Sequence, residues 1–175
     1  ENIEPTVAKT KGLFDYPVDQ NDYRPSVLIN TTPNWYAAFN RDVDYTNAIL
    51  GPKKQVRLWY VIFQDKPAIT GHWQEAYWQG GNKNEFVVTL SLDKSGKVQW
   101  CHVFSWTDNK EPVIKVEHLV SDQQTFDPIK INAAVETILT QSFERKQFKD
   151  FSYLEIEPTM NAIFWTYIIV IIVSI

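Results

Sequence analysis

The nine-residue stretch QVRLWYVIF, residues 55–63, decides the fold of this chain. Its residues are almost continuously apolar, and the polar runs Lys53-Lys54 and Gln64-Asp65-Lys66 bound it. A short apolar run without strict alternation is typical of a strand that is buried on both faces of a sheet. We therefore predict that residues 55–63 form a central strand that is covered on both sides.

Helix and strand patterns alternate along the rest of the chain. This alternation predicts an α/β fold: a mixed sheet of about four strands with helices packed on it. Two of the strands, 85–92 and 97–106, flank the turn residues Asp93–Gly96 and are expected to form a hairpin. In chain order the predicted elements are a helix after Pro33, strand 55–63, a helix after Pro67, strands 85–92 and 97–106, an edge strand at 113–120 and a helix from Asp127 or Pro128.

Helix boundaries follow from capping and breaking residues. Thr31 or Thr32 is expected to cap the first helix, and Gly51-Pro52 to end it. The helix after Pro67 is expected to turn one apolar face toward the sheet and to stop at Gly80-Gly81. Basic residues at 145–149 are expected in the last turns of the final helix, where they suit its dipole. The apolar face of the Pro67 helix is predicted to comprise Ile69, Trp73, Ala76 and Tyr77.

Four segments divide the chain. Residues 1–30 lack a sustained period and are predicted to be an extended arm with one short strand at 27–29, and residues 31–150 to be the α/β domain. Residues 151–161 are predicted to be a linker, and 162–175, AIFWTYIIVIIVSI, to be a C-terminal transmembrane anchor. The uncharged run and its early Trp165 and Tyr167 favour a membrane, and the run stops as if a span of ~20 residues were cut partway. A buried terminal strand is the alternative.

Composition and charge exclude some classes of function. The formal net charge of −4 and the scattered basic residues argue against nucleic-acid binding. One cysteine, Cys101, cannot form an internal disulfide and is expected to be a buried, inert thiol. No two of the histidines His72, His102 and His118 lie at a metal-ligand spacing along the chain, so a zinc site is not expected.

Two groups of residues are candidates for a site. Asn82, Asn84 and Glu85 offer oxygen ligands for Ca²⁺, although a Gly-Gly-Asn turn would need the same residues for backbone reasons. Aromatic residues make up 14% of the chain, which favours a surface for protein partners, with core packing as the alternative. The residues predicted to form this partner surface are Trp73, Tyr77, Trp78 and Trp106.

The order of these elements resembles the TPM domain, a family that includes a photosystem II repair factor of thylakoids and many members with a C-terminal transmembrane helix. The likeness covers residues 33–150. Two positions depart from the family pattern: residues 82–85 stand where it has Asp-Asn-Gly, and Lys146-Gln147 replace its late glycine. The matching features are Val56–Phe63, Pro67, the Asn82–Asn84 turn into Phe86-Val87-Val88, the strand from Val98, and Ser142-Phe143 through Phe148.

Three functions fit these observations. The leading expectation is a non-enzymatic, single-pass membrane protein that contacts lipid through its anchor. Its domain would bind protein partners during assembly or maintenance of a membrane complex. The resemblance implies a second, a weak phosphatase or Ca²⁺-dependent hydrolase of TPM type. A viral membrane or virion component is the third.

Overall fold

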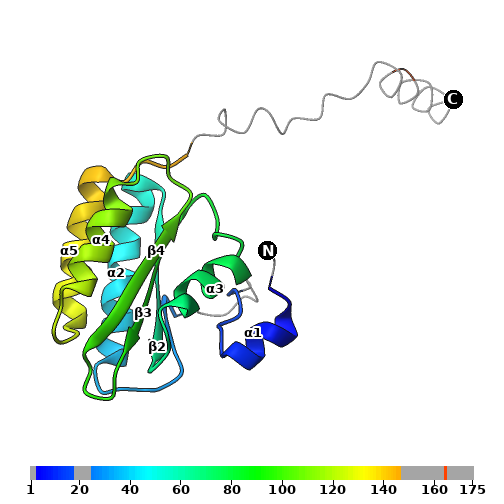
Figure 1. The fold of residues 1–175 in the computed structure, drawn as a ribbon. Coiled ribbons are helices and arrows are strands. Elements are labelled where there is room, and N and C mark those ends of the chain that lie inside the picture. The colour runs from blue at the N-terminus through cyan, green and yellow to red at the C-terminus, as the bar shows by residue number, and fades with distance from the viewer. Residues whose placement is uncertain (1–2, 18–24, 147–163, 165–175) are drawn as a thin grey trace, which may run out of the picture.

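The computed structural model describes residues 3–17, 25–146 and 164, and these form an α/β fold around one four-stranded mixed sheet. Figure 1 shows helices on both faces of the sheet, as residues 55–63 predicted. The elements are α1 (Pro5–Lys11), β1 (Val27–Ile29), α2 (Tyr36–Lys54), β2 (Arg57–Gln64), α3 (Ile69–Tyr77), β3 (Glu85–Leu92), β4 (Val98–Ser105), α4 (Glu111–Ser121) and α5 (Pro128–Ser142).

The strands lie in the order β1-β2-β3-β4, so the predicted central strand β2 has a neighbour on each side. β1, β2 and β3 are parallel, and β4 pairs antiparallel with β3. The predicted hairpin is therefore confirmed. Its turn is held by Asp93, whose Oδ1 accepts hydrogen bonds from the backbone N–H groups of Ser95 and Lys97, while Gly96 supplies the positive φ of 82°.

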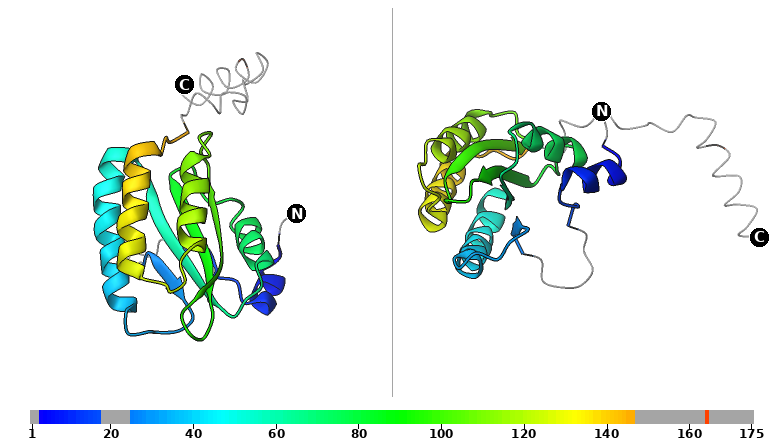
Figure 2. Two further views of the ribbon diagram at one scale, coloured as in Figure 1. Left: turned by 60° about the vertical axis from the view of Figure 1, so that its left-hand side comes forward. Right: turned by 60° about the horizontal axis from the view of Figure 1, so that its bottom comes forward.

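Strand alternation divides the core into two clusters. Even-numbered residues of β2 and β3 pack under α2, α4 and α5, where Phe39 and Tyr60 lie with ring centroids 4.9 Å apart. Odd-numbered residues, among them Trp59 and Val87, face the α1–α3 side. Figure 2 shows this three-layer arrangement from two further directions. Each fully buried large apolar side chain stabilises the fold by about 1.5–3 kcal/mol.

The two parallel crossovers have opposite hands. The connection from β1 to β2 passes through α2 on one face, and the connection from β2 to β3 passes through α3 on the other. Both move one strand position in the same direction along the sheet. One crossover is therefore left-handed, which is rare because a right-twisted strand favours the right-handed path.

One predicted strand is wrong. Residues 113–120 belong to α4, which begins with Pro112 in its first turn. Val113, Val116 and Val120 recur at helical spacing, and the last two are fully buried. The β-branched residues by themselves favour a strand. In the folded chain a helix is more favourable, because its period buries these valines against β4 and α5.

Helix ends differ from the sequence expectation in three places. α2 starts at Tyr36 without a side-chain cap from Thr31 or Thr32, and it continues through Gly51-Pro52 to Lys54. A proline removes one helical hydrogen bond, and a last turn can accommodate this loss before Gln55 ends the helix at φ 54°. α5 has the predicted Asp127 cap but ends at Ser142, so Arg145 and Lys146 lie beyond it.

The predicted extended arm contains a helix. α1 starts at a proline and ends at Gly12, whose φ of 72° provides the left-handed cap. Leu13 and Phe14, which follow α1, pack into the core cluster on the α3 side. The predicted short strand at 27–29 is confirmed as β1. The N-terminal segment is thus part of the packed domain.

The predicted linker, residues 151–161, lies outside the described residues, as does the predicted anchor, residues 162–175, apart from Phe164. Within the described part of the chain, no helix combines the length and the apolar character needed to cross a membrane. The anchor stays a prediction.

Candidate functional site

A surface hollow, here called the aromatic hollow, lies where the segment after α1 meets the end of α3 and the end of β4. Its volume is about 340 Å³. Three of the four aromatic residues predicted for a partner surface line it: Tyr77, Trp78 and Trp106. Tyr16, Gln79, Gly81 and Asn82 complete the lining. Trp106 is 41% exposed, whereas Trp78 is buried and forms the floor.

The segment after α1 is held in place by side chains of α3. Gln74, fully buried, binds both backbone groups of Phe14: its Oε1 accepts from the Phe14 N–H and its Nε2 donates to the Phe14 carbonyl, each at 2.9 Å. The Trp78 indole N–H donates to the same carbonyl at 2.8 Å. These bonds fix Tyr16, whose ring meets Trp78 edge-on at 5.3 Å.

Glu85, one of the predicted Ca²⁺ ligands, lies buried beneath the hollow. Its Oε1 accepts from the Tyr16 hydroxyl at 2.5 Å and the Trp59 indole N–H at 3.2 Å, and its Oε2 accepts from the Asn82 backbone N–H at 2.9 Å. Asn82 donates its side-chain amide to Tyr16, and Asn84 is exposed. These contacts tie the Gly80-Gly81 turn to the core, and Ca²⁺ binding here stays a prediction.

A second carboxylate lies at the rim of the hollow. The Tyr77 hydroxyl donates to Asp15 Oδ1 at 2.6 Å, and this hydrogen bond raises the pKa of Tyr77. Of the described residues that line the hollow, none is a lysine or an arginine. The hollow is thus lined by aromatic rings, and the carboxylates of Asp15 and Glu85 lie behind its lining, where each accepts hydrogen bonds from lining residues.

Trp73, the fourth predicted aromatic residue, lies elsewhere. The Lys11 ammonium group sits 3.3 Å from the centroid of its ring, in a cation–π contact that joins α1 to α3. Trp73 is half-buried under this contact. The structure thus brings together three of the four predicted partner residues and gives Trp73 a contact within the domain.

Helix α3 packs with a different face from the one predicted. Its buried residues are Thr70, Gly71 and Gln74, whereas Ile69 is 46% exposed. The reason is a close approach to the sheet at Gly71, where an added Cβ would lie 2.8 Å from the His102 Cβ. Small and polar residues fit this narrow gap, and a row of large apolar ones would not.

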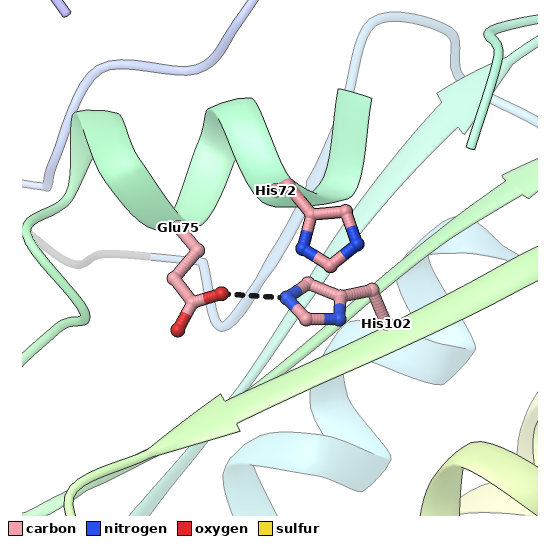
Figure 3. Close-up of side chains that lie close together, drawn as sticks. All are labelled: His72, Glu75 and His102. Carbon is pink, nitrogen blue, oxygen red and sulfur yellow. Dashed lines mark hydrogen bonds and ion pairs between the residues drawn. The ribbon is translucent and has the colours of Figure 1, made fainter. Parts of the chain in front are cut away.

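Beside this contact, α3 and β4 bring together two histidines and a glutamate (Figure 3). His72 and Glu75 are three residues apart on α3 and both reach toward His102 of β4. His102 Nε2 lies 2.7 Å from Glu75 Oε2, and the two imidazole rings are 4.2 Å apart between centroids. The hydrogen bond from His102 lowers the pKa of Glu75.

His102 has a second carboxylate neighbour from the opposite helical layer. Glu117 of α4 places Oε1 3.3 Å from His102 Nδ1 and accepts the Val103 backbone N–H at 2.8 Å. β4 is one of the two edge strands of the sheet, so Glu117 also accepts a hydrogen bond from a backbone N–H that has no partner strand on that side. His102 therefore bridges α3 and α4 around the sheet edge.

Sequence reasoning missed this cluster. The i, i+3 spacing of His72 and Glu75 on a predicted helix was a usable signal, and so was Gly71 beside them. His102 could not be added, because the distance between α3 and β4 depends on tertiary packing. Cys101, which was expected to be buried, is half-buried on the other face of β4, and burial raises the pKa of its thiol.

A second hollow, of about 290 Å³, lies at the carboxyl ends of the three parallel strands. Ile29, Gln64 and Leu92 contribute to its wall, and Trp35 closes one side. Ligands of open α/β sheets commonly bind at this edge. None of the residues predicted for the partner surface, and none of Asn82, Asn84 and Glu85, lines this hollow.

Comparison with protein-family models, with curated proteins and with solved structures finds no match for this chain. The resemblance to the TPM domain is therefore neither supported nor contradicted by relatives, and it stays a prediction. The hydrolase and virion alternatives have the same standing.

Proposed function

We propose that this chain is a non-enzymatic accessory protein whose domain binds a positively charged segment of a protein partner in the aromatic hollow. The observation that carries the proposal is the convergence of Tyr77, Trp78 and Trp106 on one hollow beside two carboxylates. Aromatic faces attract cations through their ring quadrupoles, and adjacent carboxylates add to this attraction.

The chain itself contains two examples of the proposed recognition. Lys11 lies over Trp73, and the Arg57 guanidinium lies 4.2 Å from the centroid of Trp59. Trp106 is partly exposed at the surface of the hollow, and tryptophan, tyrosine and arginine are the residues that most often dominate protein interfaces. A lysine or arginine side chain is the occupant that this combination of rings and charge favours.

A pair of synthetic peptides tests the proposal directly. Eight lysines and eight glutamates, each with blocked ends, are titrated calorimetrically into the purified 175-residue chain. We expect binding of the lysine peptide alone, weakened about 2- to 30-fold by Trp106→Ala, since a cation–π contact contributes ~0.5–2 kcal/mol.

The matched control is Tyr45→Ala, which removes a 67% exposed aromatic residue from α2 on the other helical layer. Tyr45→Ala and Trp106→Ala both leave the net charge of the chain unchanged. Any difference between their affinities for the lysine peptide therefore reports the position of the aromatic residue and not the overall attraction of the peptide to an acidic chain. Equal affinity of the wild-type, Trp106→Ala and Tyr45→Ala chains for the lysine peptide would refute recognition in the hollow.

The membrane tether is the second part of the proposal, and it is supported by the uncharged run at 162–175. A single-pass anchor would hold the domain beside the membrane complex that it serves. Alkaline carbonate extraction of membranes tests it: the full chain should stay in the pellet, and residues 1–157 should not. Release of both into the supernatant would contradict an anchor.

A further inference from the structure

We propose that His72, Glu75 and His102 form a binding site for a divalent transition-metal ion of the zinc class, separate from the aromatic hollow. One nitrogen or oxygen atom from each side chain lies within 4.8 Å of the others. Figure 3 shows the three side chains converging from one helix and one strand. Zinc ligands lie about 2.0–2.2 Å from the metal, hence about 3.4 Å from each other, so a modest inward movement completes the site.

The surroundings of His102 fit this assignment. Each ring nitrogen of His102 faces a carboxylate: Nε2 lies 2.7 Å from Glu75 Oε2, and Nδ1 lies 3.3 Å from Glu117 Oε1. An ion bound between Nε2 and Glu75 would leave the Nδ1–H to donate to Glu117.

Glu117 would act as a positioning residue. Histidine ligands of metals usually donate their second ring N–H to a carboxylate or carbonyl, which sets the tautomer and orients the ring. Glu117 is itself held by the Val103 N–H at 2.8 Å. The Glu117 carboxylate thus belongs to α4, on the opposite side of the sheet from His72 and Glu75, and it orients the His102 ring through Nδ1.

The ligand set indicates the chemical class of the ion. Two imidazoles and one carboxylate suit zinc and other first-row transition metals better than Ca²⁺ or Mg²⁺, which prefer oxygen ligands. His72 is exposed and the Glu75 side chain is 38% exposed, so the ion would keep an open position toward solvent. Three protein ligands and an open position are the arrangement of zinc sites that bind water or a further ligand.

Zinc titration of the metal-free 175-residue chain, in competition with a chromophoric chelator, tests the site. We expect one ion per chain. Glu117→Gln should weaken affinity about 10- to 100-fold, and His72→Ala at least as much. His118→Ala is the matched control, because it removes an exposed histidine from α4 outside the cluster and should change nothing.

Folding is monitored alongside binding. His72 is exposed, so His72→Ala should keep the fold although it removes the ring contact with His102. Glu75→Gln, which keeps the shape of the side chain, is the second variant. Zinc should raise the melting temperature of the wild type and of His118→Ala but not of the two ligand variants. Equal zinc affinity of the wild type, His72→Ala and Glu75→Gln would overturn the proposal and leave the cluster an ion-pair bridge.

Discussion

Replacement of Gly71 by alanine should destabilise the domain, although alanine is the better helix former. At an exposed helix position, the change from glycine to alanine would raise the free energy of unfolding by about 1 kcal/mol. In α3 the new Cβ would lie 2.8 Å from His102 Cβ, 3.0 Å from Trp100 Cζ3 and 3.2 Å from Thr89 Oγ1. His102 Cβ is attached directly to the strand backbone, so the helix must move until this contact is longer than 3.0 Å.

Such overpacking costs about 1–3 kcal/mol, and the rigid partners place Gly71→Ala toward the upper end of that range. After subtraction of the helix propensity, we expect a net loss of about 1–2 kcal/mol in the free energy of unfolding. Urea unfolding of the full chain, followed by circular dichroism, measures it. The shift of α3 should also move His72 and Glu75 away from His102 and weaken zinc binding.

Gly51 provides the matched control, because it is also helical and a Cβ there meets nothing within 4 Å. Pro52 follows it and crowds the preceding residue, which offsets part of the helix-propensity gain. Gly51→Ala should therefore change stability by less than about 0.5 kcal/mol. If Gly71→Ala proves as stable as wild type, the close approach of α3 to β4 is not a constraint on the fold.

Three further predictions concern individual groups. Glu85→Ala should cost about 2–4 kcal/mol in urea unfolding, because three donors lose a buried acceptor, whereas Asn84→Ala should cost less than about 0.5 kcal/mol; equal effects would contradict the structural role of Glu85. The lowered pKa of Glu75 means that its contribution to stability is present above its unfolded value of 4.5 and is lost as pH falls through the lower folded value. Glu75→Gln should thus flatten the acid side of a stability–pH curve, and an unchanged curve would argue against the His102 contact. The raised pKa of Cys101 predicts that iodoacetamide alkylates the native chain at pH 8 far more slowly than the urea-unfolded chain, and equal rates would show an accessible thiolate.

Local sequence patterns predicted an element correctly where the residues of that element alone distinguish helix, strand or turn. The apolar run of β2, the turn Asp93–Gly96 and the Asp127 cap of α5 each predicted the observed element. They failed at α4, where β-branched residues and a helical period compete, and at α1, which is too short to show a sustained period.

The sequence by itself determined the α/β class, the hairpin and the buried central strand β2. Tertiary structure alone decided that α2 and α3 lie on opposite faces of the sheet, that Lys11 covers Trp73, and that α3 touches β4 at Gly71. The physical reason is that periodicity reports which face of an element is buried but not which other element covers it. The meeting of His72, Glu75 and His102 is a consequence of that packing, since it depends on a helix–strand distance that a missing Cβ makes short.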